Sequence, residues 1–216
     1  MTKPLNEQTF ARGLRVLSRR DPALARILKD IGPPPMWNRR PGFSTLLHII
    51  LEQQVSLASA RAAFDRLRAA ASPLTPARFL EFDDAQLRAF GFSRQKTAYG
   101  RHLAQSILDG HFKLAALKKM DDATARAELL KLKGVGLWTA DIYLLMVLLR
   151  PDVWPHGDLA LAVAVQKIKG LSVRPTYDEL TEMAERWKPW RAVAARMFWH
   201  YYLSQKIGFT YRAELR

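Results

Sequence analysis

The stretch that most constrains the fold of this chain is residues 136–149, GLWTADIYLLMVLL, which is apolar on every side after its first turn. A helix of this kind is stable only where other elements cover it on all sides. Apolar residues recur at helical spacing along most of the remaining sequence, and strand-like alternation is almost absent. The sequence therefore predicts an all-α fold in which the segment 136–149 lies buried.

The other predicted helices are separated by breakers. Residues 5–30 predict two short helices divided near Asp21-Pro22, and GPPPMW at 32–37 predicts a linker because three prolines block a helix. Residues 43–71 predict one long helix or two helices hinged near Gln54, and Pro73 and Pro76 are expected to end this segment. Further helices are expected at 83–89, between an N-cap at Ser93 and Gly110 just past the C-terminus, and at 121–132, 158–169, 176–187 and 190–204.

The charge balance indicates a polyanionic partner. Lys and Arg number 34 against 20 Asp and Glu, which gives a formal net charge of +14. Nucleic acid is the favoured partner, and an anionic membrane surface is the weaker alternative. The longest uninterrupted apolar run, residues 144–149, is far shorter than a membrane span. With no signal peptide at the N-terminus, we expect a soluble cytoplasmic protein, and the Ala- and Arg-rich composition suggests a bacterial source.

Composition also excludes several kinds of site. The chain has no cysteine, which rules out disulfides, iron–sulfur clusters, thiolate zinc sites and thiol catalysis. None of the five histidines is paired at a metal-binding spacing. We therefore expect no transition-metal site and no required cofactor.

Two glycines, Gly134 and Gly136, form a turn between two predicted helices. Gly134 can adopt a positive φ, and Gly136 allows another backbone to approach the first turn of the next helix. Free amide groups at a helix N-terminus bind anions, so the turn is a candidate phosphate site that also includes Lys133, Val135 and Thr139. The alternative is an ordinary corner between two helices.

Asp158 follows His156-Gly157 and precedes an apolar helix. Aspartate is a common N-cap residue, and from these residues alone that is the preferred interpretation. A cap and a chemical role are compatible.

Five segments, in the same order, resemble the helix–hairpin–helix DNA glycosylase superfamily, in particular its 3-methyladenine DNA glycosylase II branch. They are FSTLLHIILEQQVSLASA (43–60), GFSRQKTAYGRHLAQSI (91–107), LKGVGLWTA (132–140), DVWPHGDLALAVAV (152–165) and ERWKPWRAVAARMFW (185–199). The resemblance implies two helical lobes with a cleft between them, bordered by the hairpin and Asp158. One lobe would span residues 40–150 and the other residues 1–39 with 151–216, without the N-terminal β domain of some relatives.

The resemblance implies that Asp158 is the catalytic carboxylate. Breaking an N-glycosidic bond builds positive charge on the sugar, and a fixed carboxylate stabilises that charge and can accept a proton from water. Asp152 and Asp141 are the rival carboxylates. Relatives that also cut the DNA backbone carry a lysine at the position of Trp138. An indole cannot form a Schiff base, so the mapping implies a monofunctional enzyme.

The resemblance also implies a base pocket and a wedge. Trp138 and Trp199 would line the pocket, together with Gln53, Tyr143 and Trp37; core packing is the alternative for both tryptophans. An aromatic face attracts the positive charge of an alkylated purine. Gln54 would be the wedge that fills the gap left by the extruded nucleotide, whereas a simple helix-capping role for the glutamine pair is the alternative.

The function expected from the resemblance is excision of alkylated bases, such as 3-methyladenine and 7-methylguanine, from double-stranded DNA by a monomeric enzyme. A monovalent cation at the carbonyls of Leu130, Leu132 and Val135 is part of the same expectation. A bifunctional glycosylase/lyase and a non-catalytic DNA-binding module are the alternatives.

Overall fold

The structure is a computed structural model that describes residues 3–206 of the chain, and all regular elements in that range are helical. The α-helices are α1 Glu7–Arg20, α2 Pro22–Ile31, α3 Phe43–Leu51, α4 Leu57–Ala70, α5 Pro76–Leu80, α6 Asp84–Ala89, α7 Arg94–Leu108, α8 Asp122–Leu130, α9 Leu137–Met146, α10 Leu159–Lys169, α11 Tyr177–Ala184 and α12 Arg191–Lys206. Two 3-10 helices, η1 Leu114–Lys119 and η2 Glu185–Trp187, complete the set. The all-α prediction is confirmed for the described residues.

The chain divides into two compact units. Unit 1 is the continuous segment Arg39–Leu148, and unit 2 combines the described residues before it with those after it, 3–38 and 149–206. The two units are therefore unequal in topology, since only unit 1 is built from one uninterrupted stretch of sequence.

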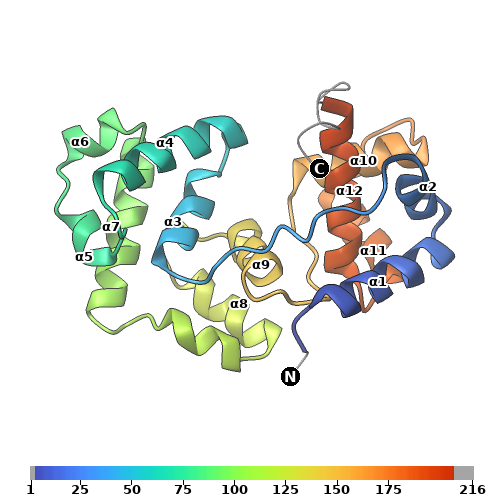
Figure 1. The fold of residues 1–216 in the computed structure, drawn as a ribbon, viewed down its shortest axis with the longest axis horizontal. Coiled ribbons are helices and arrows are strands. Elements are labelled where there is room, and N and C mark those ends of the chain that lie inside the picture. The colour runs from blue at the N-terminus through green and yellow to red at the C-terminus, as the bar shows by residue number, and fades with distance from the viewer. Residues whose placement is uncertain (1–2, 207–216) are drawn as a thin grey trace. The chain divides into compact units, whose positions relative to one another are not determined.

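In unit 1, α3 packs against α4, α7 and α9, while α8 packs on α9 and α5 on α7 (Figure 1). Helix α9 is the predicted apolar helix, and its residues from Thr139 to Leu145 are all buried. Gly100 of α7 allows close packing, because a Cβ atom there would lie 2.7 Å from the Phe79 ring. Burial of α9 therefore confirms the prediction made from its uniform apolarity.

In unit 2, α12 packs against α1, α2 and α10 (Figure 1). The two chain ends are joined by a buried network around Asp21. Its side chain caps α2 through the Ala23 amide, at 2.9 Å. It also accepts hydrogen bonds from Lys169 Nζ at 2.8 Å and from the Trp187 indole at 2.9 Å. The predicted break at Asp21 is thus also a tertiary anchor.

The predicted linker at 32–37 is held in place by Arg196 of α12. This fully buried arginine donates from Nε to the Met36 carbonyl at 2.7 Å and from Nη1 to the Ala192 carbonyl at 2.9 Å. Burial lowers the pKa of Arg196 to about 9, so its guanidinium remains charged at neutral pH.

Most predicted helix boundaries agree with the structure to within a few residues, but two short helices were not predicted. Helix α5 begins at Pro76, a residue that was expected only to end the preceding helix. Pro76 is in fact at the first helical position, where a missing N–H costs nothing, and Thr75 caps the helix. The second unpredicted element is η1, whose six residues are too few to show a helical period.

Candidate functional site: hairpin, hinge and carboxylate

The hairpin turn, residues 131–136, joins α8 to α9 in unit 1. Gly134 has a φ of +87°, and a Cβ atom on it would lie 2.2 Å from the ring of Tyr99. Only glycine fits this position, on grounds of both backbone conformation and space. The Val135 amide donates to the Leu132 carbonyl at 3.0 Å and so closes the turn.

The N-terminus of α9 is exposed at Gly136. Gly136 is the N-cap residue, no side chain caps the helix, and a Cβ atom there would meet nothing within 4 Å. Lys133 beside it is exposed. An uncapped helix N-terminus next to a lysine is suited to an anion such as a DNA phosphate. Of the residues predicted for the phosphate site, Lys133 and Gly136 are exposed, whereas the Val135 N–H is used inside the turn and Thr139 is 1% exposed.

The hinge turn, residues 52–56, separates α3 from α4. Of the two predicted arrangements, one long helix or two hinged helices, the structure has the second. Gln54 is exposed and has a φ of +56°, which is unusual for a residue other than glycine. Gln53 is half-buried, and its Nε2 atom donates to the Gly134 carbonyl and to Thr139 Oγ1, both at 2.8 Å. Gln54 is therefore presented to solvent, whereas Gln53 is bound to the hairpin.

The predicted pocket residues of unit 1 differ in exposure. Trp138 is half-buried in the first turn of α9. Tyr143 is fully buried, and this burial raises the pKa of its hydroxyl to about 12. An inaccessible side chain cannot form a pocket wall, so we assign Tyr143 to the core of unit 1.

In unit 2, Asp158 is the N-cap of α10. Its Oδ1 atom accepts from the Leu161 amide at 2.9 Å and from the indole Nε1–H of Trp199 at 3.2 Å. The residue is 8% exposed. The helix start and the tryptophan together fix the orientation of a carboxylate that is largely withdrawn from water.

The two rival carboxylates are both held in ion pairs. Asp152 pairs with Arg191, whose Nη2 lies 2.9 Å from its Oδ2. Asp141 is buried on α9 and pairs with Arg126 of α8 at 2.7 Å. Both groups therefore have a structural role in the packing of their own unit.

Two predicted pocket tryptophans belong to unit 2. Trp199 is buried on α12 and contacts the Asp158 carboxylate through its indole N–H. Trp37 is half-buried at the end of the linker, has a φ of +45°, and meets His200 edge-on with ring centroids 6.4 Å apart. The structure thus brings Trp199, but not Trp37, into hydrogen-bond contact with the carboxylate.

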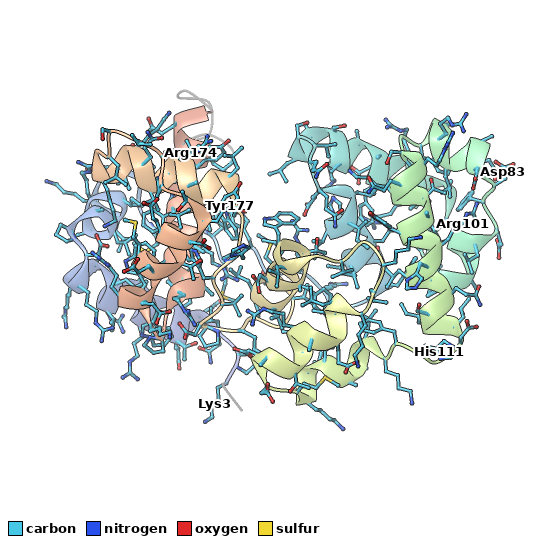
Figure 2. The ribbon with its side chains drawn as sticks, turned by 180° about the vertical axis from the view of Figure 1, so that it is seen from behind. Lys3, Asp83, Arg101, His111, Arg174 and Tyr177 are labelled. Atoms are coloured by element: carbon cyan, nitrogen blue, oxygen red, sulfur yellow. The ribbon has the colours of Figure 1, made fainter. Side chains whose placement is uncertain are left out.

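Some residues to which the sequence assigned no role also hold the hairpin turn and the hinge turn in place. Tyr99 covers the hairpin turn, and Lys96 donates to the Leu51 carbonyl at the end of α3; both lie in the 91–107 segment, which was matched only as a block. In the loop that leads to Asp158, the ring of His156 lies near the ring of Tyr177, with ring centroids 6.1 Å apart. Tyr177 and Arg174 lie on the surface of unit 2 (Figure 2).

The described residues offer no conventional metal site. Within residues 3–206, no three His, Asp or Glu side chains gather in a way that could hold a metal ion. Over the same range, no helix is both long and apolar enough to cross a membrane.

Comparison with known proteins places these features in a family. Residues 47–190 match the model of the HhH-GPD superfamily of base excision DNA repair proteins. The matched range includes the hinge turn, the hairpin turn and Asp158, and it covers more than half of the chain.

Two curated relatives are similar in sequence. The alkylbase DNA glycosidase-like protein mag2 of Schizosaccharomyces pombe is 26% identical over 201 residues, which are 89% of this chain and 94% of the relative. The YfjP protein of Bacillus subtilis, provisionally named a DNA-3-methyladenine glycosylase, is 25% identical over 185 residues. That match covers 82% of this chain but only 64% of the relative, so the chain spans less than two thirds of YfjP.

The fold is also that of a solved structure. The 3-methyladenine DNA glycosylase Mag1 of Schizosaccharomyces pombe, in complex with abasic DNA, superimposes with a TM-score of 0.83. The match covers 91% of this chain and 98% of Mag1 at 24% identity, and at that identity it concerns the fold alone. Taken with the family model, these observations establish that the chain belongs to the HhH-GPD superfamily of base excision DNA repair proteins.

Proposed function

We propose that this protein is a monofunctional DNA glycosylase that removes alkylated purines from double-stranded DNA by hydrolysing the N-glycosidic bond. The observation that carries the proposal is the carboxylate of Asp158, fixed by the Leu161 amide and the Trp199 indole. The names of the relatives, which refer to alkylbase and 3-methyladenine glycosylases, support the substrate class.

The chemistry requires a negative group more than a strong acid. An alkylated purine such as 3-methyladenine or 7-methylguanine is cationic and departs readily, so positive charge develops mainly on the sugar. A preorganised carboxylate stabilises that charge and can accept a proton from the attacking water. Asp158 has one oxygen held by two N–H donors, which orients the carboxylate before the substrate arrives.

The absence of a lysine at position 138 supports hydrolysis rather than strand cleavage. In members that cut the backbone, a lysine at this hairpin position attacks the sugar to form a Schiff base. Trp138 stands there instead, half-buried at the start of α9. Its ring can attract a cationic base by about 0.5–2 kcal/mol. Borohydride should therefore trap no covalent adduct between this protein and damaged DNA.

DNA binding is assigned to the hairpin turn. The uncapped N-terminus of α9 and exposed Lys133 would contact a backbone phosphate, and the net charge of +14 would attract the duplex as a whole. The extruded base costs a few kcal/mol to unstack, and exposed Gln54 is the candidate to fill its place. Affinity should fall steeply as the salt concentration rises.

Three further proposals accompany this function. A monovalent cation would bind the carbonyls of Leu130, Leu132 and Val135; the Leu132 oxygen accepts one N–H and retains a second lone pair for such an ion. Replacing lithium with potassium at constant ionic strength while DNA affinity is measured tests it, and an affinity that is the same in both salts would contradict it. The protein would act as a monomer and, in a bacterial cell, on chromosomal DNA in the cytoplasm.

The deciding experiment compares Asp158→Asn with Asp30→Asn. Asparagine caps a helix about as well as aspartate, so Asp158→Asn should fold normally while lacking the negative charge. Asp30 is exposed on α2, and its replacement controls for the same change of charge. Each protein is incubated with duplexes that carry one defined lesion, and abasic sites are measured with and without alkali.

We expect Asp158→Asn to lose at least about a hundredfold in the rate of base release, since it removes the charge that stabilises the transition state. Asp30→Asn should match the wild type. Wild-type activity in Asp158→Asn would overturn the catalytic assignment. Binding without any base release by the wild type would instead favour a non-catalytic DNA-binding module, and strand cleavage without alkali would favour a lyase.

A further inference from the structure

Gln53 joins the hinge turn to the hairpin turn across more than eighty residues of sequence. Its Nε2 atom lies 2.8 Å from the Gly134 carbonyl and 2.8 Å from Thr139 Oγ1. We propose that Gln53 is a positioning residue that holds the hinge, with the Gln54 side chain it presents, at a fixed place on the hairpin. On this proposal, which rests on the function proposed above, Gln53 does not read the damaged base.

The orientation of the Gln53 amide follows from its partners. The Gly134 carbonyl oxygen can only accept, so the amino group of Gln53, and not its oxygen, must face it. That amino group has two hydrogens, and its two contacts use both of them. A residue whose donors are both taken up by the protein has no donor left to offer a base.

The hinge side of this contact is held at two other points. Lys96 of α7 donates to the Leu51 carbonyl, and Arg39 forms a two-point ion pair with Glu52 at 3.0 and 2.9 Å. Gln54, next in the chain, keeps a φ of +56°. A non-glycine residue stays in that conformation only where its surroundings force it to do so. The hinge turn is therefore held by contacts on both sides of Gln53, and Gln53 is the part of it that reaches the hairpin.

The hairpin side is equally fixed. Thr139 is 1% exposed within α9, and Gly134 lies beneath the ring of Tyr99. Neither acceptor can follow the hinge if it moves. As a result, Gln53 fixes the distance between the hairpin turn, which would bind the phosphate, and the hinge turn, which presents Gln54. Binding of a DNA phosphate at the hairpin would therefore also place Gln54, with no separate movement of the hinge turn.

This coupling predicts how a Gln53 variant should behave. Because Gln53 acts on placement and not on recognition, its loss should slow the excision of every lesion by the same factor. It should also weaken binding to undamaged duplex, since the hairpin loses a support. A residue that reads the base would instead change the preference between lesions and leave undamaged DNA unaffected.

The test uses Gln53→Glu and Gln53→Met, with Gln8→Glu as the control. Glutamate keeps the size of the side chain but turns an acceptor oxygen toward the Gly134 carbonyl, although the Thr139 hydroxyl can still donate to it. Methionine removes both donors without adding charge. Gln8 is exposed on α1 and controls for the added charge. Single-turnover excision is measured at saturating enzyme on 7-methylguanine, which is cationic, and on hypoxanthine, which is neutral. Affinity for undamaged duplex is measured in parallel, well below the melting temperature of each variant.

We expect both variants to excise both lesions about tenfold more slowly, since each lost hydrogen bond accounts for roughly two- to tenfold. Affinity for undamaged duplex should fall by a similar factor, and Gln8→Glu should match the wild type. A Thr139→Val change should add little to Gln53→Met, because the two remove the same contact.

Three results would overturn the proposal. One is a Gln53→Glu enzyme that gains on the cationic lesion relative to the neutral one. The second is unchanged excision and binding in both variants, and the third is full additivity with Thr139→Val. If the wild type excises neither lesion, the proposed function fails but the positioning role is still decided by the affinity for undamaged duplex. If Gln53→Glu does not fold, Gln53→Met alone decides.

Discussion

Replacing Gly134 with alanine gives a sharp test of the hairpin geometry, because the added methyl group destabilises the fold for two independent reasons. The first is conformational: alanine at a φ of +87° is disfavoured by about 1–2 kcal/mol. The second is steric, since the new Cβ atom would lie 2.2, 2.3 and 2.6 Å from three carbons of the Tyr99 ring. That ring cannot swing away freely, because its hydroxyl accepts a hydrogen bond from Gln95 at 2.6 Å.

Displacing a packed side chain in this way costs about 1–3 kcal/mol, so the total for Gly134→Ala is about 2–5 kcal/mol. In a chain of this size each kcal/mol lowers the melting temperature by roughly 2–4 °C, which predicts a loss of about 4–20 °C. Gly136→Ala is the matched control. Its φ is −93° and nothing lies within 4 Å of the added methyl, so its stability should stay within about 0.5 kcal/mol of the wild type.

Thermal and urea unfolding of both variants measure this difference. A third variant separates the two costs: in a Tyr99→Ala background, Gly134→Ala should lose its steric part and keep only the conformational one. Equal melting temperatures for Gly134→Ala and Gly136→Ala would refute the reasoning about the turn. An undiminished effect without the ring would refute the steric part alone.

Three further outcomes follow from contacts in the structure. Trp199→Phe keeps an aromatic ring but removes the N–H donor to Asp158, so single-turnover excision should fall about tenfold with little change in stability; a full-rate enzyme would argue that the indole only packs. Asp21→Asn should destabilise the protein by about 2–4 kcal/mol at neutral pH, because Lys169 loses a buried partner. Burial raises the pKa of Asp21, but hydrogen bonds from Lys169 and the Trp187 indole outweigh it and lower that pKa below its usual value. The stabilisation is therefore present above about pH 3.9 and lost as the pH falls through the folded-state pKa, so the melting temperatures of variant and wild type should converge in acid, and a constant gap would contradict this. Gly136→Asp should weaken binding to all duplexes, since a carboxylate would oppose a phosphate at the N-terminus of α9; unchanged affinity in a fluorescence titration would exclude that site.

Local patterns in the sequence were enough to predict most of the helices. The buried helix α9, the break at Asp21 and the cap at Ser93 each depend on a few adjacent residues, and each is found where expected. Helix α5 was missed because Pro76 was read as a terminator, although proline at a first helical position is equally consistent with a start.

The contacts that shape the candidate site could not be predicted in the same way. The bond from Gln53 to Gly134 joins residues 81 apart, and no spacing rule links them. Similarly, the indole of Trp199 reaches Asp158 over 41 residues. The sequence can indicate that a glycine turn and a carboxylate matter, but the partners of each depend on tertiary packing.

The division of the chain between its units has a consequence for synthesis. Unit 1 is continuous and can complete its core while the ribosome is still adding residues. Helices α1 and α2 must wait for α12, which packs against both but begins about 160 residues after α2 ends. At about 5–20 residues per second the delay is roughly 10–30 s, during which α1 and α2 can pack against each other but the surfaces that later contact α12 stay uncovered. Removal of α1 and α2 would accordingly lower the stability of unit 2, which carries Asp158, while unit 1, which carries the hairpin turn, would keep its whole sequence.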